Sequence, residues 1–481
     1  MGEGNPGRSA IVVGGGISGL LAARELARAG VRTTVLEAAP SWGGCVGSHV
    51  VGGLTLDSGA ESFATRSPAV ADLAAELGIA DGIVAPNPGG AWVQLPDGPR
   101  ELPRTGVLGI PANPWDPEVR RSLGFLGSLR ASLDALLPAS LGTGSGDTSV
   151  AALVRARMGR RVLDRLVAPV VGGVHSADPG VLDIDMVAPG LRAGIRQHGS
   201  LAAAVAAQRR GGAGAGTGNT APQGGLQKAG SAVAGLRGGM HTLVAALVAD
   251  LAGRGVTLLS STPADSVART AGGWHVASGD TGYDAGLLVV AVDGPAAVGL
   301  LAGALPELSS RRPDPGPDVS LVTLVVDQPR LDDAPRGTGV LVAPQSPGIR
   351  AKALTHATAK WGWLAERTAP GTHVLRLSYG RAGSGNGPAS ATEEELFQAA
   401  LHDASALLTV PVTAGDVRDW DVVRWSGALP FASLGHKRRV AEVREICAAD
   451  GTLAVVGGWL SGNGLAAIVA DTPKVLHSLL P

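Results

Sequence analysis

The chain has 481 residues and a mass of 48.0 kDa, a length that corresponds to about three domains. Hydrophobic residues make up 45% and charged residues 17%, a balance that excludes a disordered chain and a coiled coil. The 40 basic and 41 acidic residues leave a net charge of −1. The basic excess typical of nucleic-acid-binding proteins is therefore absent, and we expect no nucleic-acid partner.

The two cysteines, Cys45 and Cys447, are too few for a disulfide framework or a cysteine-rich metal site. We therefore expect free thiols, a reducing compartment and no metal ion. No apolar run approaches the roughly 18 residues that a membrane-spanning helix needs. The polar start of the chain leaves no room for the apolar core of a signal peptide. These features predict a soluble, cytoplasmic protein without a transmembrane segment.

The first recognisable motif lies near the N-terminus. The apolar run Ala10–Val13 has no polar alternation, which predicts a parallel strand buried on both faces. It leads into Gly14–Gly19, which matches the pattern G-x-G-x-x-G, and then into a predicted helix at Ser18–Ala29. A second predicted strand, Arg32–Leu36, ends at Glu37. This order of elements predicts a dinucleotide-binding βαβ unit, whereas the glycine pattern alone would also fit an ordinary turn.

Each part of this unit has a physical role. Gly14 permits the tight turn, Gly16 lets the backbone approach a pyrophosphate, and Gly19 lets the helix pack closely on the strand. The helix N-terminus offers free N–H groups and the positive end of its dipole to phosphate. Glu37 can accept hydrogen bonds from a ribose diol. The predicted dinucleotide contacts are Gly14, Gly15, Gly16, Ser18, Gly19 and Glu37.

Later segments identify the dinucleotide by resemblance. Glu37–Gly44 is similar to the stretch that follows the acid in glutathione-reductase-like flavoproteins, where a Gly-Gly pair passes the FAD pyrophosphate. Asp57–Ser62 resembles the flavin-contacting turn of amine-oxidase-like flavoproteins, and Gly457–Ala467 resembles their C-terminal flavin motif. Leu287–Ala291 resembles the strand that returns to the FAD domain, which implies a discontinuous domain. Further FAD contacts implied by the resemblance are Ala38, Gly43, Gly44, Gly59, Ala60, Glu61, Ser62, Val267, Trp425, Gly464, Leu465, Ala466 and Ala467.

The middle of the chain narrows the resemblance to one family. Ser149–Gly159, a predicted helix with Asp147 or Thr148 as its N-cap, leads to Leu166–Pro179. This combination resembles the protoporphyrinogen/coproporphyrinogen oxidases of haem biosynthesis, and among them the actinobacterial coproporphyrinogen III oxidases. Similar segments continue over nearly the whole chain and include Gly235–Val244, Lys360–Trp361, Leu429–Pro430 and Gly435–His436.

The resemblance implies an activity. An enzyme of this family would use FAD and O2 to remove six electrons from coproporphyrinogen III, giving coproporphyrin III and H2O2. We assign no catalytic acid or base, because aromatisation of the macrocycle favours loss of its protons and the flavin carries the redox chemistry. A ferrochelatase or another enzyme of the haem pathway is an expected partner. Protoporphyrinogen IX is the alternative substrate, and the extra carboxylates of coproporphyrinogen III suit a chain without an evident membrane patch.

Other functions stay open at this point. A flavin amine oxidase shares the FAD motifs, but such enzymes hold the amine between two aromatic rings. Neither tyrosine of this chain, Tyr283 or Tyr379, lies in the C-terminal flavin motif. The haem-family segments within residues 149–179 argue against a carotenoid-desaturase-like enzyme. A flavin-binding regulator without turnover is the remaining alternative, and turnover of a porphyrinogen would distinguish it from an enzyme.

Two residues are candidates for substrate binding by this resemblance. Arg66 lies where the family has a basic residue that pairs with a substrate propionate, and a guanidinium suits a carboxylate because it donates from two nitrogens. A surface arginine is the alternative. His175, where the family usually has tyrosine, would line the substrate cavity or serve as a structural histidine. Arg192, Arg196 and His198 would form a propionate rim or a solvated helix face. Trp425 would flank the flavin or fill a core position.

The expected fold is α/β, with a discontinuous Rossmann-like FAD-binding domain, a substrate-binding α+β domain and a helical domain, as in amine-oxidase-like flavoproteins. The expected FAD-binding domain comprises residues 8–66, 231–300 and 440–481. The expected substrate-binding domain comprises residues 67–104 and 301–439, and the helical domain comprises residues 105–210. Residues 211–225 have almost no apolar side chain to bury, which predicts a flexible loop.

Overall fold

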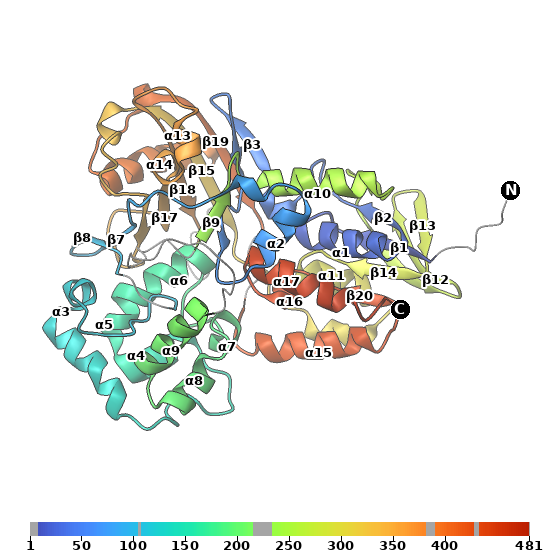
Figure 1. Cartoon of the computed structure of the whole chain (residues 1–481), viewed down its shortest axis with the longest axis horizontal. Coiled ribbons are helices and arrows are strands. Elements are labelled where there is room, and N and C mark those ends of the chain that lie inside the picture. Colours follow the sequence, from blue (N-terminus) through green and yellow to red (C-terminus); the bar gives the residue numbers. More distant parts are fainter. Residues whose placement is uncertain (1–7, 104–106, 215–232, 381–389, 428–431, 481) are drawn as a thin grey trace.

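The computed structural model describes residues 8–103, 107–214, 233–380, 390–427 and 432–480, and every structural statement below concerns these residues. Figure 1 shows three parts: a layered α/β part, a second sheet beside it, and a group of helices below that sheet. Leu429–Pro430, which belongs to the family resemblance, lies outside the described residues. None of the helices described is long and apolar enough to cross a membrane.

A five-stranded parallel sheet is formed by β1 (Ser9–Val13), β2 (Arg32–Leu36), β10 (Thr257–Leu259), β14 (Leu287–Val290) and β20 (Leu453–Val455). The strand order is β10-β2-β1-β14-β20, so segments from the first, middle and last parts of the chain lie side by side. Apolar side chains leave the sheet on both faces, because each face is covered by a further layer.

One face of this sheet is covered by helices α1 (Ile17–Arg28), α10 (His241–Gly253) and α17 (Leu465–Leu476), which Figure 1 shows beside one another. Helix α1 begins and ends one residue earlier than the sequence predicted. Gly30 follows its C-cap with a left-handed φ of 75°, as expected for a helix-terminating glycine. The other face packs against the antiparallel strands β11 (Ser266–Thr270), β12 (Gly273–Ser278) and β13 (Thr281–Ala285).

A seven-stranded sheet forms the second part, in the order β19-β15-β18-β17-β16-β7-β8. Its neighbours are antiparallel except β16 and β7, which run parallel. Helix α14 (Glu393–Leu408) packs on one face, and α12 (Ala357–Lys360) and α13 (Gly362–Ala365) pack on the other. The strands are β7 (Trp92–Leu95), β8 (Gly98–Glu101), β15 (Val319–Asp327), β16 (Gly339–Val342), β17 (Ala353–His356), β18 (Thr372–Tyr379) and β19 (Val417–Trp425).

The helical group contains α3 (Pro117–Ser132), η3 (Leu133–Leu136), α4 (Val150–Met158), α5 (Arg160–Val162), η4 (Leu163–Val167), α6 (Ala168–His175), α7 (Ile184–Val187), α8 (Leu191–His198) and α9 (Leu201–Gly214). A buried ion pair holds its centre: Arg157 Nε donates to Asp134 Oδ1 at 2.6 Å. The same guanidinium donates to the carbonyls of Pro138 and Leu141, which are 3.1 and 3.0 Å away. Burying this charge is tolerated because its donors are satisfied.

Two local predictions in the helical group were wrong. The N-cap of α4 is Ser149, whose hydroxyl accepts from the Ala152 N–H at 3.1 Å, and neither Asp147 nor Thr148 caps this helix. The helix begins at Val150, so only Ser149 has the N-cap spacing to the third helical N–H. Helix α9 continues through Gly214, so the first four residues of the predicted loop 211–225 are helical. The rest of that segment lies outside the described residues.

Candidate functional site

The glycine turn after β1 is shaped by close backbone packing. A Cβ atom at Gly19 would lie 1.8 Å from the Gly14 carbonyl oxygen, so helix and turn approach closely only because residue 19 is glycine. Gly14 itself has a φ of 103°. A Cβ at Gly16, by contrast, would meet no atom within 4 Å. Glycine at position 16 therefore leaves open space directly at the N-terminus of α1.

A second glycine pair lies against this turn. The Gly43 N–H donates to the Gly15 carbonyl at 2.8 Å, and a Cβ at Gly44 would lie 3.5 Å from the Gly16 Cα. Gly43 has a φ of 102°, and a side chain there would meet Val244. The Gly-Gly pair predicted to pass the pyrophosphate is therefore brought directly against the glycine turn.

The carboxylate of Glu37 is fixed at the edge of this region. One oxygen accepts from the Gly15 N–H at 2.6 Å, and the other accepts from the Ala39 N–H at 2.7 Å. Each carboxylate oxygen has two acceptor positions, so both can accept a further hydrogen bond. The neighbouring Ala38 is exposed. Glu37 is thus oriented by the backbone with acceptor capacity left for a ribose diol.

The N-terminus of α17 lies next to α1. Leu465 and Ala466 are buried in the same apolar cluster as Ile17 and Leu20 of α1. Gly464 is the N-cap, and a Cβ on it would meet no atom within 4 Å. Neither α1 nor α17 has a side-chain N-cap or an acidic residue in its first turn. No side chain occupies the first N–H groups of either helix, so both helix ends are available to an anionic ligand.

The segment 57–62 is the third component of the site. The Ala60 N–H donates to the Cys45 carbonyl at 2.8 Å, and the Ser58 N–H donates to the Gly47 carbonyl at 3.0 Å. A Cβ at Gly59 would lie 2.1 Å from the Cys45 carbonyl oxygen. This segment therefore lies directly against the chain that follows the Gly-Gly pair.

Side chains of the seven-stranded sheet hold that segment from the other side. Arg376 in β18 donates to the Gly59 carbonyl at 2.8 Å and to the Asp57 carbonyl at 3.3 Å. Trp425, at the end of β19, donates from Nε1 to the Ser58 carbonyl at 2.8 Å. Trp425 therefore contacts the flavin-contacting segment rather than the interior of its own sheet.

The carboxylate of Glu61 lies between two cations. Arg376 is 2.9 Å from one of its oxygens, and Lys360, at the end of α12, pairs with the other. Burial by itself would raise the pKa of this carboxyl group. The charges of Arg376 and Lys360 outweigh burial and lower the pKa of Glu61 to about 2. Glu61 is therefore ionised, and its side chain is used to join the segment 57–62 to the seven-stranded sheet.

Sequence reasoning missed Arg376 and gave Lys360 no role. One signal was available: the chain has only five lysines, and the structure describes four of them. Lys352 and Lys360 have buried or mostly buried side chains, whereas Lys437 and Lys474 are exposed. Burying an ammonium group is costly unless it is paired, and Lys360 meets this requirement through its ion pair with Glu61. Arg376 carries no such signal, since arginine is abundant here.

The predicted substrate-binding residues come from two different parts of the fold. Arg66 is exposed between β5 (Phe63–Ala64) and α2 (Ala69–Glu76), and it makes no hydrogen bond or ion pair with the described residues. His175 is half-buried at the end of α6. Burial lowers the pKa of His175 to about 4, so its imidazole is neutral near pH 7. Neutral His175 offers one donor and one acceptor, but no charge, to a ligand.

Three further predictions have clear positions. Val267 lies in β11 and belongs to the same apolar cluster as Leu36, which ends β2 just before Glu37.

Arg192 is buried and 2.8 Å from Asp185, and Arg196 donates to a backbone carbonyl at 2.7 Å. Arg192 therefore stabilises the helical group from a buried position, whereas Arg196 lies on the exposed face of α8 and also binds a backbone carbonyl.

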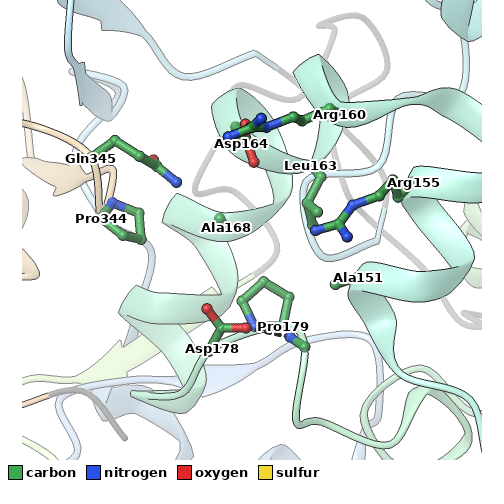
Figure 2. Close-up of a pocket in the computed structure, with 11 residues that line it drawn as sticks. Ala151, Arg155, Arg160, Leu163, Asp164, Ala168, Asp178, Pro179, Pro344 and Gln345 are labelled. Carbon is green, nitrogen blue, oxygen red and sulfur yellow. Dashed lines mark hydrogen bonds and ion pairs between the residues drawn. The ribbon is translucent and has the colours of Figure 1, made fainter. Parts of the chain in front are cut away.

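A separate cavity of about 470 Å³ lies in the helical group, between α4, α5, η4, α6 and the loop after β16. Figure 2 shows Arg155 and Leu163 on its wall and Arg160 paired with Asp164 at 2.9 Å. None of the predicted flavin or substrate residues lines it. Two arginines, Arg155 and Arg160, and two aspartates, Asp164 and Asp178, line the cavity, so it has no dominant charge.

Comparisons with known proteins place this chain among flavin-containing enzymes. A model of flavin containing amine oxidoreductases matches residues 17–471. A coproporphyrinogen III oxidase of Mycobacterium leprae is 32% identical over 98% of this chain and 98% of its own length. A coproporphyrinogen III oxidase of Propionibacterium freudenreichii is 30% identical over 96% of this chain and 88% of its own length. A crystal structure from Exiguobacterium, assigned by name to the protoporphyrinogen oxidases, superposes with a TM-score of 0.81 at 25% identity and 99% coverage of both chains. The chain belongs to the flavin-containing amine oxidoreductases, in the coproporphyrinogen III oxidase branch.

Proposed function

We propose that this chain binds FAD and uses it, with O2, to oxidise coproporphyrinogen III to coproporphyrin III in the cytoplasm. The observation that carries the proposal is the full-length similarity to proteins named coproporphyrinogen III oxidase, joined to a site with the parts a flavin dinucleotide needs. The balanced reaction removes six hydrogens from the macrocycle in three steps, and each step converts one O2 to one H2O2. The product is a candidate substrate for a ferrochelatase or another enzyme of the haem pathway.

The residues present fit FAD. Gly16 and Gly464 leave open space at two neighbouring helix N-termini, where a pyrophosphate and a ribityl chain would find N–H donors. Glu37 is fixed by two backbone donors and has acceptor capacity for the adenosine ribose. Gly44 and Gly59 keep side chains out of the surface between them. The bound flavin would supply the two-electron redox chemistry of each step.

The protein's own groups position the reactants. Arg376 and Trp425 hold the backbone of the segment 57–62 by hydrogen bonds to three consecutive carbonyls. Glu61 fixes the end of that segment through two ion pairs. We assign to Arg66 the binding of a substrate propionate, because its exposed guanidinium is not engaged by the described residues. His175 would contact the substrate as a neutral hydrogen-bonding group.

The decisive experiment is turnover of both porphyrinogens by the purified protein. The flavin is released and identified, and kcat/KM is then measured for coproporphyrinogen III and protoporphyrinogen IX by porphyrin fluorescence, with H2O2 measured in parallel. We expect bound FAD, a higher kcat/KM for coproporphyrinogen III and three H2O2 per porphyrin. Bound flavin without turnover of either substrate would support a regulator and contradict the proposal.

Protoporphyrinogen IX is the second candidate substrate. The Exiguobacterium structure bears the name of a protoporphyrinogen oxidase, and a plant protoporphyrinogen oxidase is 30% identical over 40% of this chain. The two substrates differ in the number of carboxylates, four against two. A preference for protoporphyrinogen IX in the same assay would overturn the substrate and leave the flavin-dependent reaction in place.

A further inference from the structure

Lys352 is a buried cation that has no role in the site described so far. It is 2% exposed, and its ammonium group donates to the hydroxyl of Ser176, which is 1% exposed. Lys352 directly precedes β17 of the seven-stranded sheet, whereas Ser176 follows α6 of the helical group. An ammonium group is costly to bury unless it is hydrogen-bonded. The bond to Ser176 therefore ties two parts of the fold together at a buried position.

The backbone around Lys352 is fixed by three neighbouring elements. Its N–H donates to the Ser378 carbonyl of β18 at 2.8 Å, and its own carbonyl accepts from the Val342 N–H of β16 at 3.0 Å. The two preceding N–H groups donate to one oxygen of the buried Asp403 of α14, at 3.1 and 2.7 Å. The base of this side chain therefore cannot shift without breaking hydrogen bonds to β16, β18 and α14.

Helix α6 lies over the sheet face that also holds the segment 57–62. It packs against β16, where the side chain of Leu341 would be 2.6 Å from a Cβ atom added to the nearest helix glycine. Leu341 is opposite Ala353 in the sheet, and Ala353 is opposite Ser378. Opposite residues share a face, and so do residues two apart in one strand, so Arg376 lies on this face as well. The end of α6 and the segment 57–62 are therefore neighbours, with an offset of about 7 Å along β18.

The last turn of α6 depends on the contact with Lys352 for two reasons. Ser176 is the C-cap of the helix and has a left-handed φ of 53°, which is unfavourable for residues other than glycine. The carbonyl groups at a helix C-terminus carry partial negative charge, which a nearby cation stabilises. The ammonium group of Lys352 is both a donor to Ser176 and a positive charge at this helix end. It therefore orders the turn that carries His175.

We propose that Lys352 is a positioning residue for the porphyrinogen: its ammonium group fixes the last turn of α6, and with it His175, beside the segment 57–62. This inference rests on the function proposed above, in which His175 contacts the substrate. Lys352 is too deeply buried to contact the substrate itself, so it acts through α6. A base held by three elements and a charged tip on a helix end suit a residue that sets the spacing between two parts of a fold.

The alternative is a lysine that only stabilises the fold. Loss of such a residue lowers the melting temperature but leaves KM unchanged, as long as the protein is folded at the assay temperature. Loss of a positioning residue loosens the last turn of α6 and weakens substrate binding. Local order at the end of α6 and the separate values of KM and kcat therefore distinguish the two roles.

The first test is amide hydrogen exchange of the flavin-loaded, full-length protein without substrate. Lys352→Met keeps the length of the side chain and removes its charge and its donors. We expect amides in the last turn of α6 to exchange at least about tenfold faster in this variant than in the wild type, with α4 nearly unchanged. Lys352→Arg, which keeps the charge, should restore part of the protection. Equal exchange at the end of α6 in wild type and Lys352→Met would overturn the proposal.

The second test is the kinetics of coproporphyrinogen III oxidation. Lys352→Met should raise KM by about threefold or more with kcat near that of the wild type, because the displaced helix end is remote from the reacting carbon. The matched control is Leu153→Ala, which opens a cavity in the core of the helical group and should lower the melting temperature without changing KM. Ser176→Ala removes only the acceptor and takes the place of Lys352→Met if that variant loses its flavin. An unchanged KM would overturn the proposal.

A double-mutant cycle tests whether Lys352 acts through the end of α6. In a His175→Ala background, Lys352→Met should change KM by less than about twofold, because the contact that Lys352 positions is already lost. Additive changes in KM would overturn the positioning role. A wild-type protein that oxidises no porphyrinogen would contradict the proposed function instead, and hydrogen exchange would still decide whether Lys352 orders the end of α6.

Discussion

The guanidinium of Arg376 lies 2.9 Å from the carboxylate of Glu61, and the same side chain donates to the backbone of the segment that precedes Glu61. Arg376 belongs to the seven-stranded sheet, whereas Glu61 follows the glycine-rich surface of the flavin site. One arginine therefore couples the seven-stranded sheet to the segment 57–62. Its planar guanidinium serves both tasks because its donors point in fixed, divergent directions.

We predict that Arg376→Ala destabilises the protein and weakens flavin binding. The substitution removes two hydrogen bonds to carbonyls and leaves Glu61 with one cation. Breaking a largely buried ion pair costs about 3 kcal/mol in the free energy of unfolding. Denaturant titration and flavin absorbance measure the two effects. The matched control is Arg418→Ala, which breaks the exposed pair with Asp327 and should change stability little, because solvent screens exposed pairs. Similar losses in both variants would contradict the special role of Arg376.

Gly16→Val should separate flavin binding from folding. Gly16 has a φ of −68°, and a Cβ there meets no atom of the protein within 4 Å, so the flavin-free chain should keep its stability. The added side chain occupies the space predicted for the pyrophosphate. The variant should therefore purify without flavin and lose the stabilisation that bound cofactor provides, about 3 kcal/mol at a hundredfold excess over Kd. Thermal melts with and without added FAD measure this difference. The control is Gly299→Ala, at a helical glycine where an added Cβ also meets no atom within 4 Å. A Gly16→Val protein that retains FAD would contradict the assignment of the pyrophosphate to this position.

Arg66→Ala should raise KM with little change in kcat. A propionate remote from the reacting carbon is bound equally in the ground and transition states, so its loss affects binding alone. A charge-assisted pair contributes about 1.5–3 kcal/mol, which corresponds to about tenfold to 150-fold in KM. Arg66→Lys should restore only part of the affinity, because an ammonium donates less directionally than a guanidinium. Arg32→Ala, at an exposed arginine in β2, is the control. An unchanged KM in Arg66→Ala would make Arg66 an ordinary surface residue.

Acid should destabilise the fold through buried histidines. Burial, and to a smaller extent the neighbouring His373, lower the pKa of His356 to about 3. His373 is itself bonded to Asp332. The unfolded chain binds a proton below about pH 6.5 that folded His356 does not accept. Stability is therefore complete above pH 6.5 and falls as the pH drops from 6.5 toward 3, by up to about 1.4 kcal/mol per pH unit for this group. His175 should add a similar loss down to about pH 4.

The measurement is the free energy of unfolding between pH 6.5 and 4.5, above the range in which carboxylates such as Glu61 take up protons. His356→Leu should reduce the slope of stability against pH in this window, whatever its effect on absolute stability. An identical slope in wild type and His356→Leu would show that His356 does not titrate differently on folding.

The sequence by itself determined the parts of the site whose geometry is local. The strand, the glycine turn and α1 appear where they were predicted, because hydrogen bonds over a few residues and the steric demands of Gly14 and Gly19 fix them. The family, the flavin and the doubly covered sheet followed from such local motifs. Helix ends were less certain: Ser149 replaced the predicted N-cap, because a cap depends on where the first helical turn forms.

Only the tertiary structure decided which distant side chains meet. Lys360 is 299 residues from Glu61 in the chain, and no local pattern links them. The same holds for the exposed apolar side chains of α3, Phe125, Leu126 and Leu129. Their spacing is that of a buried helix face. Whether such a face is covered depends on the other helices, and here small residues of α3 take the inward side. Contacts between remote segments are set by packing of the whole chain, which local propensity does not contain.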